Sequence, residues 1–332
     1  MPELRKDPVI SRWVIISTER SKRPSDFRKE KEEQKEVFCP FCPGNEGQTP
    51  PEIFAIRPHN SAPNSQGWEL RVIPNKFPAL GVDGQLNRRG EGIYDMMSGV
   101  GAHEVIIETP KHGESLADLS LPHIQQVFSA FKNRILDLRN DIRLKYTLIF
   151  KNHGAAAGAS LAHSHSQLIA TPILPKRIVE ELSGARNYFK FKERCIFCDI
   201  IHQELKDGVR VVFDNDLFIA LAPYAPRFPF ETWILPKEHH SHFELINEEG
   251  LQHLALTLKI LLQKINAALQ FPAYNFVIHT SPVQEAPLSH YHWHIEFMPR
   301  LIRTAGFEWG TGFYINTTSP ESAAKYLREI EI

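Results

Sequence analysis

The sequence predicts an α+β fold of two tandem, related halves, each with an antiparallel sheet and a packed helix. Three observations support this prediction. A set of landmarks occurs twice in the same order, short β-branched or apolar runs bounded by Pro, Gly or Asn accompany each set, and each half contains one long segment with apolar residues at helical spacing. We place the halves at residues 1–178 and 179–332, and their sheets can join into one.

The repeat begins with a pair of cysteines in each half. Cys39-Pro-Phe-Cys42 recurs as Cys195-Ile-Phe-Cys198. Each pair is followed by a histidine, which is His112 in the first half and His239 in the second. An alternating histidine motif comes next. It is His163-Ser-His165-Ser-Gln167 in the first half and His290-Tyr-His292-Trp-His294 in the second. The motifs lie 127 residues apart and the cysteine pairs 156. The first half therefore carries extra residues, which we assign to loops in the tracts 57–67 and 81–101.

The predicted elements follow from local patterns. Helices are expected over 121–138, where Pro122 lies near the start, and over 248–269. A further strand is expected to lead into each histidine motif. The other predicted strands are Trp13–Ile16, Leu70–Ile73, Val105–Ile107, Val209–Phe213, Leu217–Leu221 and Thr232–Leu235.

Composition narrows the function classes. The chain has 332 residues, 42% of them hydrophobic, with 38 Lys+Arg against 39 Asp+Glu. A net charge this close to zero gives no positive electrostatic field that would attract a nucleic acid, so we expect no nucleic-acid partner. No apolar stretch approaches the length of a membrane span, and the N-terminus has no apolar leader segment. We therefore expect a cytoplasmic protein with no membrane partner.

The four cysteines predict metal binding. Paired C-x-x-C motifs in a reduced, intracellular protein are usually metal half-sites or redox dithiols. A redox pair is expected to open a helix, whereas Cys39 is followed by two prolines and two glycines within the next eight residues. Tetrahedral zinc accepts two thiolates and two imidazoles, and the chain has 16 histidines to supply them. A redox pair and inert thiols remain the alternatives.

The first histidine motif predicts the reactive site. Alternation on a strand places His163, His165 and Gln167 on one face. The preceding Gly/Ala/Ser-rich loop, 154–160, can bring its backbone N–H groups close to a phosphate. A neutral imidazole is a good nucleophile once a hydrogen bond fixes its tautomer, so it can attack the α-phosphorus of a nucleoside diphosphate sugar. Spacing alone leaves open that His163 and His165 are both zinc ligands or core residues.

These motifs together resemble the galactose-1-phosphate uridylyltransferase family of the histidine-triad superfamily, over roughly residues 3–330. The resemblance rests on the two cysteine pairs, Arg20-x-x-Arg23-Pro24 and Asn152-x-Gly154-Ala-Ala-x-Gly158-x-Ser160-x-x-His163-x-His165-x-Gln167. It implies two histidine-triad-like halves, a homodimer and transfer of a nucleotide through a covalent nucleotidyl-histidine.

The resemblance also implies roles for individual residues. The nucleophile falls on His165, a phosphoryl-binding amide on Gln167 and a phosphate-contacting serine on Ser160. The implied substrate-binding residues are Arg20, Arg23, Asn75, Phe77, Asn152 and Gly158. The resemblance implies two structural zinc sites. The ligands of the first are Cys39, Cys42, His112 and His163, and those of the second are Cys195, Cys198, His239 and His292. For the fourth ligand of the second site, strict repeat symmetry favours His290 and the resemblance favours His292. We choose His292.

Two departures from the common bacterial members bear on the substrate. Ser164 replaces a proline between the two histidines, and the C-terminal segment 306–316 lacks the family's sugar-contacting pattern. Both features resemble the plant ADP-glucose phosphorylase-like branch. We expect transfer of UMP from UDP-glucose to a hexose 1-phosphate, with transfer of AMP from ADP-glucose to phosphate as the alternative. A histidine-triad hydrolase and a zinc-stapled scaffold or nucleotide sensor without catalysis are further alternatives.

Overall fold

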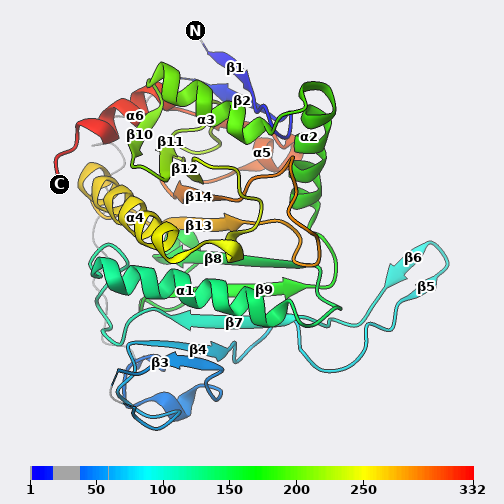
Figure 1. Cartoon of the computed structure of the whole chain (residues 1–332), viewed down its shortest axis with the longest axis vertical. Helices are drawn as coiled ribbons and strands as arrows, with labels where there is room; N and C mark the ends of the chain where they lie inside the picture. The colour runs from blue at the N-terminus through cyan, green and yellow to red at the C-terminus, as the bar shows by residue number, and fades with distance from the viewer. Residues whose placement is uncertain (1, 18–37, 59) are drawn as a thin grey trace.

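One antiparallel sheet runs through both halves of the chain (Figure 1). The computed structural model describes residues 2–17, 38–58 and 60–332. Within them, ten strands form the sheet in the order β10-β11-β12-β14-β13-β8-β9-β7-β4-β3. The strands are β3 (Phe54–Ile56), β4 (Leu70–Pro74), β7 (Ala102–Ile107), β8 (Tyr146–His153), β9 (His165–Thr171), β10 (Val211–Asp214), β11 (Phe218–Leu221), β12 (Thr232–Pro236), β13 (Tyr274–His279) and β14 (His294–Pro299).

The sheet has the internal symmetry that the repeat predicts. Strands β3-β4-β7-β9-β8 come from the first half, and β10-β11-β12-β14-β13 repeat this order in the second. The halves meet where β8 pairs with β13, with Tyr274 opposite His153 and Ile278 opposite Ile149. This arrangement confirms the α+β fold of two antiparallel halves and shows that their sheets are joined.

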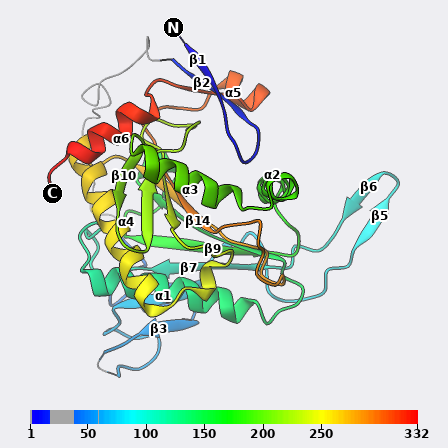
Figure 2. The ribbon, with the colours of Figure 1, turned by 45° about the horizontal axis from the view of Figure 1, so that its top comes forward.

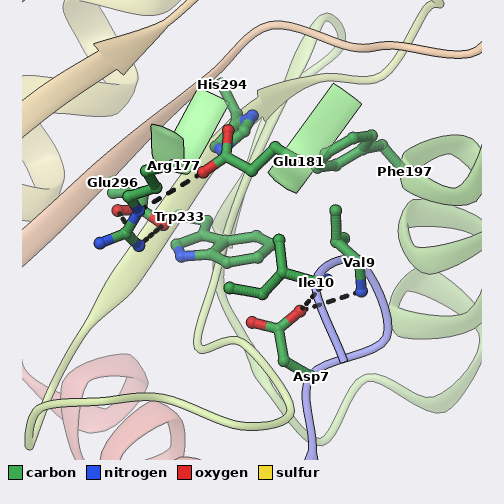
Figure 3. Close-up of a pocket in the computed structure, with 9 residues that line it drawn as sticks. All are labelled: Asp7, Val9, Ile10, Arg177, Glu181, Phe197, Trp233, His294 and Glu296. Atoms are coloured by element: carbon green, nitrogen blue, oxygen red, sulfur yellow. Dashed lines mark hydrogen bonds and ion pairs between the residues drawn. The ribbon is translucent and has the colours of Figure 1, made fainter. Parts of the chain in front are cut away.

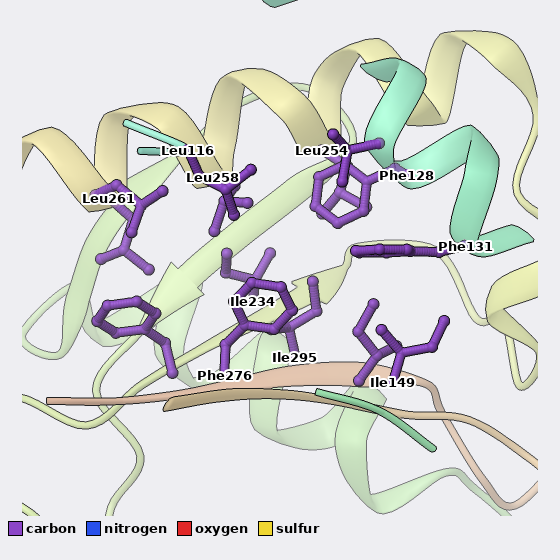
Figure 4. Close-up of a cluster of buried hydrophobic side chains, with 14 of the residues drawn as sticks. Leu116, Phe128, Phe131, Ile149, Ile234, Leu254, Leu258, Leu261, Phe276 and Ile295 are labelled. Atoms are coloured by element: carbon purple, nitrogen blue, oxygen red, sulfur yellow. The ribbon is translucent and has the colours of Figure 1, made fainter. Parts of the chain in front are cut away.

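Two long helices cover one face of the sheet. Helices α1 (Leu121–Leu138) and α4 (Glu248–Leu269) have the bounds that their apolar spacing predicts. Ser120 and Asn247 cap their N-termini by accepting hydrogen bonds from backbone N–H groups in the first turn. The main hydrophobic core lies between these helices and the sheet, as Figure 4 shows for Phe128 and Leu258 above Ile295.

The opposite face is covered differently in the two halves. Helices α2 (Lys176–Lys192) and α3 (Ile196–Asp207) pack against the second half (Figures 1 and 2). Neither helix was predicted from the sequence. On the first half, Tyr146 of β8 joins this packing, and the other described residues on this face form a small apolar cluster that includes Phe41 and Trp68. This difference leaves room for a pocket on the first half.

Smaller elements lie around the sheet. Strands β1 (Glu3–Lys6), β2 (Trp13–Ile16) and β15 (Tyr314–Asn316) form a separate sheet, and helices α5 (Gly306–Thr311) and α6 (Pro320–Glu329) flank it along the chain. The tract 81–101, expected to be a loop, contains a hairpin of β5 (Arg89–Glu91) and β6 (Tyr94–Met96) that projects from the body (Figure 2). No helix in the described ranges is long and apolar enough to cross a bilayer.

Candidate active site and metal centres

A pocket of about 480 Å³ opens on the first half, beside the start of β9. Its size is typical of a site for a nucleotide-sized ligand. Five of the predicted site residues lie in its wall. The lining residues are Phe38, Pro40, Phe41, Gln48, Thr49, Pro50, Ile73, Asn75, Lys76, Phe77, Val105, Ser160, Leu161, His165 and Gln167.

His165 is held in one orientation at the edge of this pocket. Its Nδ1 lies 2.8 Å from the backbone oxygen of His163, which accepts the Nδ1 proton. The ring of Phe41 packs edge-on against the imidazole, with ring centroids 5.4 Å apart. Burial, together with the nearby charge of Lys151, lowers the pKa of His165. The imidazole is therefore neutral near pH 7, with the lone pair on Nε2 free for a ligand.

Gln167 is oriented by a histidine that the sequence reasoning missed. His103 Nδ1 accepts a hydrogen bond from the backbone N–H of Ala79, at 3.1 Å, so the ring proton lies on Nε2. His103 Nε2 therefore donates to Gln167 Oε1, 2.9 Å away. The Gln167 amide nitrogen is left free to donate into the pocket. A histidine in strand β7, two residues before Val105 and so on the same face, was the available signal.

The other predicted substrate residues differ in placement. Ser160, Asn75 and Phe77 lie in the pocket wall, and the Phe77 side chain is 83% exposed. Asn152 is not among the residues that line the pocket. Its side-chain oxygen accepts a hydrogen bond from Asn275 of the second half, at 2.7 Å. Gly158 does not line the pocket either. Arg20 and Arg23 lie outside the described residues.

The glycine-rich loop before His163 has a backbone that other residues would strain. Gly154 and Gly158 have φ angles of +80° and +87°. A Cβ on Gly154 would also lie 2.9 Å from the Cβ of Ala273. Glycine at these two positions lets the loop turn tightly between β8 and the histidine motif.

The first cysteine pair forms a four-residue cluster with two histidines. The ligand atoms of Cys39, Cys42, His112 and His163 all lie within 4.8 Å of one another. His163 Nδ1 is 3.6 Å from each sulfur, and His112 Nδ1 is 3.4 Å from Cys42 Sγ. A tetrahedral zinc ion separates its sulfur and nitrogen ligands by about 3.6 Å. The four side chains therefore fit a zinc ion without rearrangement.

Electrostatics and hydrogen bonds at this cluster agree with metal binding. Burial and the adjacent Cys39 thiol raise the pKa of Cys42 to about 11, so two ionised thiolates need a cation between them. His163 Nε2 lies 2.7 Å from the backbone oxygen of Thr109, which fixes the ring with Nδ1 facing the sulfurs. The same residue, His163, thus connects the metal cluster to His165 through its backbone oxygen.

The second half repeats the metal cluster. Cys195, Cys198, His239 and His292 lie within the same 4.8 Å limit. Cys198 Sγ is 3.4 Å from His239 Nδ1 and 3.6 Å from His292 Nδ1. The backbone oxygens of Leu288 and Pro236 lie at hydrogen-bond distance from the other ring nitrogens of His239 and His292.

The structure places His292, not His290, in this cluster. His165 and His294 each begin a strand, and each directs Nδ1 at the backbone oxygen of the histidine two residues earlier. The two motifs are therefore 129 residues apart, rather than the 127 counted from His163 to His290. This two-residue shift explains why strict repeat symmetry favoured His290.

The counterpart of His165 in the second half, His294, is closed off. Its side chain is 1% exposed and its ring packs against the rings of Phe197 of α3 and Trp233, which line the same small cavity (Figure 3). The remaining cavity is about 10 Å³, room for about one water molecule. His294 stacks on His279, with ring centroids 4.8 Å apart. The second half therefore has no space for a substrate at this position.

Buried charges surround His294. Glu181, His279, His294 and Glu296 lie close enough to hold a metal ion. Their two carboxylates are already compensated, because His279 lies 3.0 Å from Glu181 and 3.4 Å from Glu296. Two arginines add to this compensation, since Arg177 and Arg227 both pair with Glu296. We therefore describe these residues as a buried ion-pair cluster.

The ion-pair cluster makes stability depend on pH. Burial alone would lower the pKa of His279, but Glu181 and Glu296 raise it to about 9. The unfolded value is about 6.5, so this stabilisation is complete below that pH and is lost as the pH rises through 9. Between pH 6.5 and 9.5, we expect the chain to lose about 3 kcal/mol more unfolding free energy than the variant His279→Gln. Urea unfolding at several pH values measures this difference, and parallel pH profiles would contradict it.

Two family models match the chain. The model of the N-terminal domain of galactose-1-phosphate uridyl transferase matches residues 1–175, and that of the C-terminal domain matches residues 181–327. The chain belongs to the galactose-1-phosphate uridyl transferase family. This confirms the resemblance and makes the chain a member of a family of nucleotidyltransferases.

Similar proteins include two enzymes with different names. ADP-glucose phosphorylase of Arabidopsis thaliana is 41% identical over all of this chain and 93% of its own length. Galactose-1-phosphate uridylyltransferase of Thermotoga maritima is 32% identical over all of this chain and 99% of its own length. Among solved structures, an Arabidopsis thaliana ADP-glucose phosphorylase with bound ADP-glucose superposes with a TM-score of 0.86, at 38% identity and full coverage of both chains.

Proposed function

We propose that the protein transfers a nucleoside monophosphate from a nucleoside diphosphate hexose to a phosphate-bearing acceptor through a covalent bond to His165. The observation that carries this proposal is the single free nitrogen of that imidazole at the pocket. Nδ1 donates to the backbone oxygen of His163, so Nε2 keeps its lone pair and borders the pocket beside Gln167.

The reaction takes two displacement steps at the same phosphorus. In the first, His165 Nε2 forms a bond to the α-phosphorus and the bond from that phosphorus to the bridging oxygen breaks, which releases hexose 1-phosphate. In the second, a phosphate oxygen of the acceptor bonds to the α-phosphorus and the N–P bond breaks, so His165 regains its lone pair. No proton has to leave Nδ1 in either step, because His163 holds it throughout.

The neighbouring side chains suit this chemistry. Gln167 directs its free amide N–H groups at the oxygens of the transferring phosphoryl group, because His103 holds its oxygen. Ser160 lies in the same wall and supplies a hydroxyl donor. We assign Asn75 and Phe77 to the nucleoside, and Gly158 of the glycine-rich loop and Asn152 of the strand before it to the phosphate side of the site. Arg20 and Arg23 keep the phosphate-binding role that the family resemblance implies.

We propose that each of the two Cys/His clusters holds a structural zinc ion. Two thiolates and two imidazole nitrogens at separations of 3.4–3.6 Å support this choice. Zinc supplies a cross-link between loops there. At the first cluster the cross-link fixes His163, whose backbone oxygen orients His165.

Two donor and acceptor pairs fit the proposal. UDP-glucose with a hexose 1-phosphate corresponds to the enzyme named in Thermotoga maritima, and ADP-glucose with inorganic phosphate to the one named in Arabidopsis thaliana. The identity of 41% against 32%, together with Ser164 between the two histidines, favours the second pair.

A labelling experiment separates these pairs. The protein is incubated with ADP-glucose or UDP-glucose, each labelled in the α-phosphate, and the protein-bound label is counted. We expect ADP-glucose to label the protein, and added phosphate to release the label as ADP. Labelling by UDP-glucose with release by a hexose 1-phosphate would support the other pair. Rapid release into water without any acceptor would indicate a hydrolase, and labelling by neither donor contradicts both transfer reactions.

We further propose a cytoplasmic homodimer in which residues 1–178 carry the reaction and residues 179–332 form a closed copy. The β5–β6 hairpin supports self-association, because Ile93 and Tyr94 at its tip are 88% and 69% exposed. The reduced thiols that the zinc sites need support the location. Light scattering on an Ile93→Ser/Tyr94→Ser variant tests the role of the hairpin.

A further inference from the structure

A buried ion pair lies directly behind the strand that bears His165. Lys151 of β8 and Glu108, which follows β7, are 1% and 0% exposed, and Lys151 Nζ lies 2.6 Å from Glu108 Oε2. Neither side chain reaches the pocket. Both side chains lie on the side of the sheet that α1 covers, opposite the reactive imidazole.

This pair holds the backbone on both sides of His165. The hydroxyls of Ser164 and Ser166 each donate to the Glu108 carboxylate, at 2.6 Å. Lys151 Nζ also donates to the backbone oxygen of His165, at 3.0 Å, and to the hydroxyl of Ser164, at 3.1 Å. The residues before, at and after the nucleophile are therefore all fixed by one buried network.

The second half is an internal control for this network. The strand registers place Ile278 at the position of Lys151. Ile278 pairs with Ile295, directly after His294, and the β8–β9 register, in which Phe150 pairs with Gln167, brings Lys151 opposite Ser166, directly after His165, when it is extended by one residue. Trp293 and Ile295 flank His294 as the two serines flank His165. All three second-half residues are buried in the apolar core, where Figure 4 shows Ile295 among apolar neighbours.

The comparison of the two halves shows whether the sheet needs this network in order to fold. The same strand geometry forms in the second half with apolar residues, so the sheet does not need the network. Buried ion pairs are often no more stabilising than well-packed apolar groups of the same size, because both charges lose their hydration. The network occurs behind the histidine that faces a pocket, and its equivalent is missing behind His294, which faces none.

We propose that Lys151 and Glu108 are positioning residues for the transfer reaction, which hold His165 so that Nε2 stays directed at the α-phosphorus. They act through the backbone on either side of the imidazole. This inference rests on the proposed function of His165. A nucleophile that must form and then break a bond to phosphorus gains from a fixed direction of attack, because small misplacements lower the rate steeply.

The test removes both charges together, in the variant Lys151→Met/Glu108→Leu, so that neither charge is left unpaired. We expect it to fold, to bind the same amount of zinc and to keep its KM for the nucleotide sugar within about threefold. We expect the single-turnover rate of protein labelling to fall by about 10- to 100-fold. A purely structural role would lower the melting temperature and leave this rate unchanged.

Matched variants make the result decisive. Arg134 and Glu104 form another buried pair between α1 and the same strand β7, with two hydrogen bonds of 2.7 Å and no contact to the histidine motif. Arg134→Met/Glu104→Leu should leave the labelling rate unchanged. If the first variant does not fold, Ser164→Ala/Ser166→Ala decides, with an expected loss of about tenfold. A wild-type labelling rate in either network variant overturns the inference, whereas failure of the wild-type protein to be labelled overturns the proposed function instead.

Discussion

Replacing His165 with alanine is expected to abolish the transfer reaction while the protein still binds its nucleotide sugar. The substitution removes the only atom that the proposal lets bond to phosphorus, so turnover should fall by about 10⁴-fold or more. Affinity for the donor should change little, because the remaining pocket wall is intact. Steady-state exchange between labelled hexose 1-phosphate and the nucleotide sugar measures turnover, and calorimetric titration measures binding.

The second half supplies the control for this substitution. His294 occupies the equivalent strand position but is enclosed by Phe197 and Trp233. His294→Gln should lower the unfolding free energy and leave exchange at the wild-type level. Equal losses of exchange in the two variants would show that His165 contributes to folding rather than to bond formation.

Loss of the first metal cluster is expected to have the next largest effect. Cys39→Ser should reduce bound zinc from two ions to one and lower turnover by at least about tenfold, because His163 then no longer holds His165 rigidly. Cys195→Ser should remove the other ion and destabilise the second half, but leave the rate at saturating substrate near the wild-type value. Both variants should lose several kcal/mol of unfolding free energy, since metal binding contributes directly to folding.

Elemental analysis, thermal unfolding and turnover of the same two preparations test this difference. Cys39 and Cys195 belong to clusters of matching geometry, since sulfur to nitrogen distances of 3.4 and 3.6 Å occur in both. They differ in that only the first cluster adjoins the pocket histidine. If Cys195→Ser lowered turnover as much as Cys39→Ser, the distinction between a cluster that supports the site and one that supports only the fold would be wrong.

The sequence predicts the fold and the centre of the site because both depend on local patterns. Helices α1 and α4 have apolar residues at regular spacing, and the structure places both at the predicted bounds. The structure brings together the two sets of four Cys and His residues that the family resemblance implied, and each set could hold a metal ion. Helices α2 and α3 were missed although α2 has 17 residues, because their apolar residues pack against strands that are distant in the sequence, and each half was assigned a single helix.

The supporting residues of the site depend on tertiary contacts and were missed for that reason. His103 orients Gln167 across 64 residues of chain, and Lys151 meets Glu108 across 43. The signal was present in weak form, since Lys151 and Glu108 are charged residues in or beside apolar strand runs, at positions that face the core. The two-residue error in the repeat arose because the second motif has a third histidine, so that counting from its first histidine, His290, matched His163 to the wrong residue.

The most direct measurement is the intact mass of the protein after brief incubation with a nucleotide sugar and no acceptor, followed by mapping of the modified residue. We expect a mass increase of one nucleoside monophosphate, located on His165, acid-labile as a phosphoramidate and removed when phosphate or hexose 1-phosphate is added. An unmodified protein that still converts the nucleotide sugar, or a nucleotide attached to any other side chain, would contradict the covalent role of His165.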